Sequence, residues 1–157
     1  MNEKIIWSIG FVLIVMILCL LKPNAGRIFL GVFYLIMAIG INGVNAFTNP
    51  QSTVQMGADS LIPLYRTFFT EVVAAAPSLF ILIVVLFQLS VGLLILNKHK
   101  RVKLGLTGAT IFLILITPFG VIQLPWLGIA VVQKYLLRKD YDKTLVEIIS
   151  GKLRKNK

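Results

Sequence analysis

The sequence predicts an all-α integral membrane protein, a helical bundle with three clear spans, a broken helical hairpin, an external amphipathic helix and a short cytosolic C-terminal helix. Apolar residues make up 57% of its 157 positions and charged residues only 14%, whereas soluble domains average about 45–50% and about 25%. The mean hydropathy is +0.88. Several apolar runs also approach the length of about 17–25 residues that a membrane-spanning helix needs. The composition therefore excludes a disordered chain, and the single cysteine excludes a disulfide scaffold.

The first three spans are expected at about residues 5–21, 28–47 and 77–96. The first run lies between Lys4 and Lys22 and is ended by Pro23. A cleaved signal peptide is the alternative for this run, but its charged start is balanced by Glu3 and no small-residue cleavage site follows. The third span opens with Pro77, which suits the first helical position because its missing N–H is not needed there. We therefore predict three clear spans.

The stretch 104–137 is too long for one span, and Pro118, Gly120 and Pro125 interrupt it. A proline inside a helix removes a hydrogen bond and clashes with the preceding turn. The sequence thus predicts a broken helical hairpin with arms at 104–120 and 121–137. Each arm is close to the lower limit of about 17 residues for crossing a bilayer. Two short, tilted spans are expected, with a shallow re-entrant loop as the alternative.

The distribution of charge predicts the orientation, because Lys and Arg near span ends favour the cytoplasmic side. A hairpin at 104–137 leaves Lys4 and Arg66 outside. It gathers the other basic residues near span ends on the inside, namely Lys22, Arg27, Lys98, Lys100, Arg101, Lys103, Lys134, Arg138, Lys139 and Lys143. A single kinked span would divide them evenly. We therefore predict a multi-pass cell-membrane protein with its N-terminus outside, a transmembrane bundle over 1–137 and a basic cytosolic tail over 138–157.

The net charge of +10 is expected to serve that topology rather than a nucleic-acid partner. Clustered Lys and Arg on the cytosolic side attract anionic membrane lipids, and no aromatic interleaving or nucleic-acid-binding motif accompanies them. In the tail, Leu145, Ile148 and Ile149 share one helical face. They predict a short cytosolic amphipathic helix that ends at Gly151.

The external loop 48–76 begins with a polar, turn-rich part and continues with an apolar stripe at helical spacing. The apolar stripe consists of Leu61, Leu64, Tyr65, Phe68 and Val72. It predicts an external amphipathic helix. We expect this helix to lie at the lipid headgroups, with a lid over an outward-facing cavity as the alternative.

No catalytic or metal site is predicted. His99 is the only histidine and Cys19 the only cysteine, whereas a closed zinc site needs four ligands. No metal or haem is expected, and any other cofactor is left unknown. Polar residues inside apolar runs mark either helix–helix contacts or a functional cavity. Asn42 and Asn45 at the outer end of the second span, and Gln88 within the third, could form such a cavity with Arg66 and Glu71 at its mouth.

Residues 27–137 resemble the DoxX-like family of small four-helix membrane proteins. The resemblance rests on RIFLGVFYLIMAIGIN, on the external amphipathic loop and on FQLSVGLLILNKHKRVKLGL. The matching residues are Arg27, Leu30, Gly31, Gly40, Gly92, Leu93, Leu94 and the basic turn at 98–103. Gln88 takes the place of an in-helix glutamate of that family, and the span at 5–21 is additional. The resemblance implies a link to sulfur or quinone redox systems, and Arg27 completes a candidate ligand-binding set of Arg27, Asn42, Asn45, Arg66, Glu71 and Gln88.

Three functional hypotheses follow. The leading one is a non-catalytic membrane scaffold or accessory subunit, which supports a redox or transport complex or binds an apolar ligand such as a quinone or lipid between its helices. Its partners would be membrane lipids, other complex subunits or further copies of the chain. The second is an oligomeric transporter or channel that uses the broken hairpin, since interrupted helices often line substrate sites. The third is an interfacial membrane enzyme that uses Glu71 and Arg66.

Overall fold

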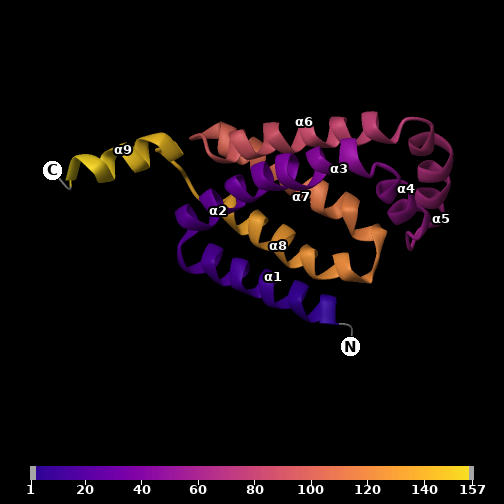
Figure 1. Ribbon diagram of the computed structural model, residues 1–157. Coiled ribbons are helices and arrows are strands. Elements are labelled where there is room, and N and C mark those ends of the chain that lie inside the picture. Colours follow the sequence, from indigo (N-terminus) through magenta and orange to yellow (C-terminus); the bar gives the residue numbers. More distant parts are fainter. Residues whose placement is uncertain (1–2, 156–157) are drawn as a thin grey trace.

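The predicted all-α fold is confirmed. The computed structural model describes residues 3–155, and within that range every regular element is a helix. The long helices are α1 (Glu3–Leu21), α2 (Pro23–Ile36), α6 (Pro77–Ile95), α7 (Lys100–Ile116) and α8 (Leu127–Leu136). They run lengthwise beside one another (Figure 1). α6 packs between α2 and α7, and α8 packs against both α7 and α1.

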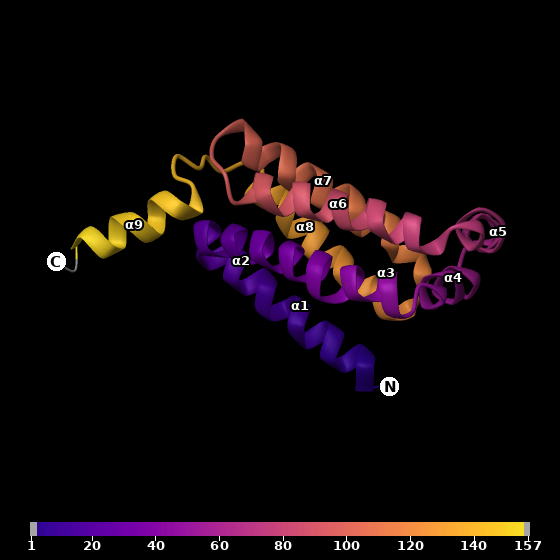
Figure 2. The ribbon, with the colours of Figure 1, turned by 45° about the horizontal axis from the view of Figure 1, so that its top comes forward.

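The two ends of the bundle differ. Figures 1 and 2 place the start of α1, the α7–α8 turn and the small helices α4 and α5 at one end. The α1–α2 and α6–α7 turns and the C-terminal helix α9 lie at the opposite end. We call these the loop end and the tail end. Successive long helices therefore run in opposite directions, as the orientation predicted from the distribution of Lys and Arg requires.

Four helices in the described part of the chain are long and apolar enough to cross a membrane. They are Glu3–Leu21, Pro23–Thr48, Pro77–Ile95 and Lys100–Phe119. The protein therefore has the build of a multi-pass membrane protein. Many large apolar side chains on the outer faces are exposed, including Trp7, Ile14, Leu86 and Leu93. A bilayer would cover these side chains with hydrocarbon.

The predicted hairpin forms two antiparallel arms. The first arm begins at Lys100 rather than at 104, because the basic residues there are good helix formers. The break consists of two 3-10 segments, Thr117–Phe119 and Val121–Trp126, which contain Pro118 and Pro125. The second apolar arm, Val121–Leu136, is shorter than a standard span. A 3-10 helix rises about 2.0 Å per residue against about 1.5 Å for an α-helix, so this arm reaches about 27 Å.

The second span departs from regular α-helix. α2 continues through a π-helical segment, Met37–Gly43, into α3 (Val44–Thr48). Gly40 and Gly43 fall in this segment, and glycine weakens the α-helix by about 1 kcal/mol relative to alanine. Such wide turns inside α-helices are frequent at functional sites. This one contains Asn42.

Residues 48–76, the loop predicted to be external, form a compact helical layer at the loop end, which we call the external layer. It contains α4 (Gln51–Ala58), α5 (Pro63–Thr67), a π-helical turn (Phe68–Val72) and a 3-10 turn (Val73–Ala75). The polar first part, expected to be turn-rich, is thus helical as α4. In the second part Leu64 is 74% exposed and Val72 59%, whereas Phe69, which is not in the apolar stripe, is only 2% exposed. Most of the apolar stripe therefore faces outward and Phe69 fills the core of the layer.

The C-terminal helix α9 covers Leu145–Lys155 and extends away from the bundle at the tail end (Figure 1). The expected stop at Gly151 is wrong. An isolated glycine costs only about 1 kcal/mol in a helix, and the Lys, Leu and Arg that follow it are strong helix formers. Asn156 and Lys157 of the predicted tail lie outside the described residues.

Candidate functional site

Arg27 of the predicted cavity lies at the tail end, in the first turns of α2, and its side chain is fully buried. Its Nε donates a 2.7 Å hydrogen bond to Oδ1 of Asn24. Its Nη1 donates to the carbonyl of Ile95 at 3.1 Å and to that of Asn97 at 2.6 Å, and its Nη2 donates to the carbonyl of Lys143. The guanidinium carbon also lies 4.6 Å from the ring centroid of Tyr141. We call this set of contacts the Arg27 clamp.

The Arg27 clamp joins three parts of the chain. Its acceptors are the Asn24 side chain of α2, the carbonyl of Ile95 at the end of α6, that of Asn97 in the turn that follows, and one carbonyl of the segment that leads into α9. Carbonyls at a helix C-terminus carry partial negative charge and have no partner within the helix. A planar guanidinium with five donors can satisfy several of them at once. The buried cation therefore fastens the tail to the ends of α2 and α6.

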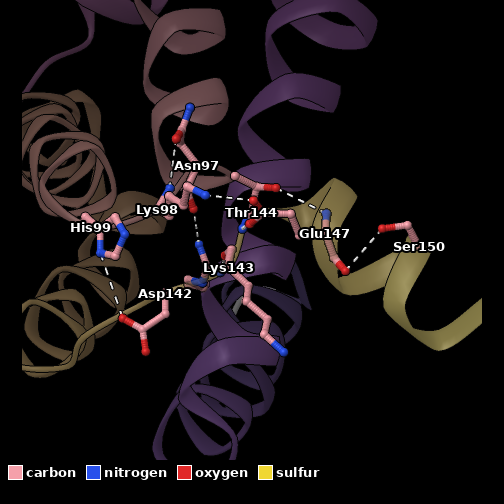
Figure 3. Close-up of polar contacts among 9 residues, drawn as sticks. Asn97, Lys98, His99, Asp142, Lys143, Thr144, Glu147 and Ser150 are labelled. Atoms are coloured by element: carbon pink, nitrogen blue, oxygen red, sulfur yellow. Dashed lines mark hydrogen bonds and ion pairs between the residues drawn. The ribbon is translucent and has the colours of Figure 1, made fainter. Parts of the chain in front are cut away.

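Further contacts secure the same segment (Figure 3). Lys98 Nζ and Glu147 Oε1 form an ion pair at 2.7 Å, and the other carboxylate oxygen of Glu147 accepts a 2.7 Å bond from the N–H of Thr144. The bond to Lys98 and then the bond to Thr144 lower the pKa of Glu147 from 4.5 to about 2. The Thr144 hydroxyl in turn accepts the N–H of Glu147 at 3.2 Å, which completes a capping box at the start of α9.

Tyr141 packs against the Arg27 guanidinium at the tail end. Its ring is buried, and its hydroxyl donates a 3.1 Å hydrogen bond to the carbonyl of Leu136. Its own carbonyl accepts the N–H of His99 at 2.8 Å. Burial raises the pKa of Tyr141 from 10.0 to about 12, although the nearby Arg27 acts in the opposite direction. Tyr141 is therefore neutral and packed throughout the physiological pH range.

Asn42 and Gln88 are brought together. Nδ2 of Asn42, in the π-helical segment, donates a 2.7 Å hydrogen bond to Oε1 of Gln88 on α6. Gln88 is 3% exposed, and Asn45 is half-buried on the next turn of the same span. This is the interhelical amide contact expected of polar residues inside a membrane bundle.

Arg66 and Glu71 belong to the external layer, and both are exposed. Arg66 Nε donates a 2.6 Å hydrogen bond to the carbonyl of Ser60. The salt bridges of the described chain do not include a pair between Arg66 and Glu71. Arg27 is about 20 Å along its span from Asn42. The structure thus joins Asn42 with Gln88, with Asn45 one turn away, and places Arg66 and Glu71 in the external layer and Arg27 at the tail end.

A second buried polar group of the bundle, on α8, was not predicted from the sequence. Gln133 of α8 is fully buried, and its Oε1 lies 3.0 Å from the hydroxyl of Thr110 on α7. Tyr34 of α2 donates to the carbonyl of Ala109 at 3.1 Å and lies beside the Gln133 amide. Nε2 of Gln133 is a buried donor without a hydrogen-bond partner in the described structure. Gln133 is a polar residue near the end of an apolar run, and this position in the sequence could have indicated a buried polar contact.

The external layer is fastened to the hairpin break. The carbonyl of Pro118 accepts hydrogen bonds from the Ser60 hydroxyl at 2.7 Å and from the Leu61 N–H at 2.8 Å. The Tyr65 hydroxyl donates to the carbonyl of Leu115 at 3.0 Å. Carbonyls left free by the broken helix thus gain partners from the loop, which closes this end of the bundle.

The most strongly polar side chains of the bundle, those of Arg27, Asn42, Gln88 and Gln133, bond to other helices or to the tail, whereas Ser90, Thr107 and Thr117 bond the backbone of their own helix. Among the residues that the structure describes, no three His, Cys, Asp or Glu side chains gather as a metal site would require. No family model matches the chain, and neither a curated protein nor a solved structure shows significant similarity to it.

Proposed function

We propose that the protein is a small multi-pass membrane scaffold or accessory subunit, with its N-terminus outside and its C-terminus in the cytoplasm. The observation that supports this role best is the use of the strongly polar side chains. Arg27, Gln88 and Asn42 form hydrogen bonds between helices or between a helix and the tail. A catalytic site or a polar conduction path would need such groups to face a cavity.

The exposed surfaces favour the same role. Leu64 and Val72 of the apolar stripe face outward at the loop end. At the tail end, Val146 and Ile149 of α9 are 74% and 51% exposed. In the proposed orientation the first surface meets the outer headgroups or a partner subunit. The second lies on the cytosolic side, near basic residues that favour anionic lipids.

The resemblance to the DoxX-like family suggests a redox or quinone-linked complex as the setting. Gln88 cannot ionise where that family has a glutamate, so it cannot relay a proton. A supporting role in such a complex is therefore the form of the proposal that suits this chain.

Affinity purification from membranes in a mild detergent, followed by mass spectrometry of co-purifying proteins and lipids, tests the proposal. The doubly substituted variant Leu64→Glu/Val72→Glu should lose a specific partner that binds the apolar stripe. Thr70→Glu, on the other face of the same segment, is the control and should retain it. Turnover of a lipid or quinone substrate by the purified protein alone would overturn the proposal.

A further inference from the structure

An apolar groove runs along the outside of the bundle between α1 and the second arm of the hairpin. Ile5, Ile9 and Met16 line one side, and Val121, Leu124 and Gly128 line the other. Its volume is about 510 Å³, and none of its lining residues has a polar side chain. Leu13, Val121 and Leu124 are each between 42% and 53% exposed, so the groove opens sideways, toward the place of the bilayer.

The length of the groove matches one leaflet. From Ile5 to Met16 the helix rises about 16 Å, and half of a hydrocarbon core of about 30 Å is about 15 Å. The groove begins where α1 starts and where the hairpin turns, so it belongs to the leaflet at the loop end. It ends near mid-depth, where Gly128 meets α1.

The walls of the groove are held at both ends. A Cβ atom on Gly128 would lie 2.9 Å from Sδ of Met16 and 3.1 Å from Cγ1 of Val12, so the glycine permits the close approach of α1 and α8. Toward the loop end, the Ser8 hydroxyl donates a 3.2 Å hydrogen bond to the carbonyl of Ile122. The ring centroids of Phe11 and Trp126 are 5.6 Å apart. These contacts connect α1 to the second arm of the hairpin on either side of the groove.

We infer that this groove binds one acyl chain of a phospholipid from the leaflet at the loop end. At this depth no water is present to fill a gap between helices, and an empty gap would forfeit the dispersion contacts of its lining. A quinone ring is a poor occupant, because its carbonyl groups would find no donor side chain in the lining. A phospholipid chain needs none, since its polar headgroup stays at the surface. The bound chain would serve as a packing element between α1 and α8, independently of any partner protein.

Native mass spectrometry of the delipidated full-length protein, titrated with phosphatidylcholines of increasing chain length, tests this inference. We expect one retained lipid per protein molecule. The affinity should rise from dioctanoyl to dimyristoyl lipid and then level off once the acyl chain fills the groove. Leu124→Trp should lower the affinity by about tenfold or more, the effect of excluding roughly two methylene groups. Leu79→Trp, a 60% exposed leucine on α6 at a similar depth, is the control and should bind as the wild type does.

Thermal unfolding of both variants in the same detergent separates groove blocking from misfolding. If Leu124→Trp unfolds at a much lower temperature than wild type, Val121→Trp replaces it as the blocking variant. Equal lipid affinity in the blocking and control variants would overturn the inference. So would a lipid-free dimer that the blocking variant dissociates, because a second copy of the chain would then be the occupant. Neither result would bear on the partner-capture test of the scaffold proposal.

Discussion

Removal of the Arg27 guanidinium should release the tail from the bundle. Arg27→Met keeps an unbranched apolar side chain of similar reach but provides no donor. The carbonyls of Ile95, Asn97 and Lys143 would then lose a charged partner at a buried site. Arg27→Lys is the intermediate case, since one ammonium has three donors and lacks the planar fork that joins separate acceptors.

The size of the effect follows from these contacts. A hydrogen bond to a charged group contributes about 1.5–3 kcal/mol, and a buried carbonyl left unpaired costs about 1–3 kcal/mol. These costs do not add in full, because the tail can move away and admit water. With three carbonyls affected and part of each cost recovered in this way, the loss comes to about 3–5 kcal/mol. We expect that loss for Arg27→Met and roughly half of it for Arg27→Lys.

Two assays test this prediction. Unfolding titrations in mixed micelles give the free energy of unfolding, and limited trypsin digestion reports release of the tail through cleavage at Arg138, Lys139 and Lys143. Arg101→Met, which removes an exposed arginine at the same end, is the control and should stay within about 0.5 kcal/mol of wild type. An Arg27→Met protein with wild-type stability and a wild-type digestion pattern would refute the clamp.

Three further predictions concern separate parts of the molecule. A double-mutant cycle with Asn42→Leu and Gln88→Leu should give a coupling of about 0.6 kcal/mol and no more than about 1.7 kcal/mol in micellar unfolding; zero coupling would contradict the contact at 2.7 Å. The pKa of Glu147 is lowered from 4.5 to about 2, so its contribution to the attachment of α9 is complete above about pH 4.5 and is lost as the pH falls toward 2. Carboxyl NMR should show this titration in wild type and not in Glu147→Gln, and a midpoint near 4.5 would show that the Lys98 pair does not form. Gly57→Ala should destabilise the external layer by about 1–3 kcal/mol, because its Cβ would lie 2.0 Å from the Phe69 ring; Phe69→Leu should restore part of the loss, and additive effects would argue against this contact.

Much of the fold could be predicted from the sequence, because spans depend on length and composition and the break depends on proline. The runs at 5–21 and 77–96 end within two residues of α1 and α6. The wide turn around Asn42 could not be predicted, because Gly40 and Gly43 weaken the α-helix there but do not by themselves specify a π-helical turn. The same is true of Phe69. Helical spacing identified an apolar stripe, but Gly57 on α4 determines which aromatic ring becomes buried.

The partners of the candidate cavity residues could not be predicted from the sequence, for a physical reason. Polar residues in apolar runs can be recognised from sequence, but their depth and partners depend on the packing of the helices. Asn42 and Gln88, which were predicted to line the same cavity, bond to each other. Arg27 instead binds backbone carbonyls, which have no sequence signature, and Gln133 was overlooked although it is fully buried.

The proposed topology requires that the two ends of the bundle lie on opposite sides of a membrane. Cysteine accessibility in a Cys19→Ser background measures it directly, with Gln55→Cys on α4 and Lys100→Cys at the start of α7, both exposed positions. A membrane-impermeant maleimide should label the Gln55→Cys protein in intact cells and the Lys100→Cys protein only after permeabilisation. Labelling of both proteins from the same side would contradict the bundle as a membrane-spanning unit, and the reverse pattern would contradict its orientation.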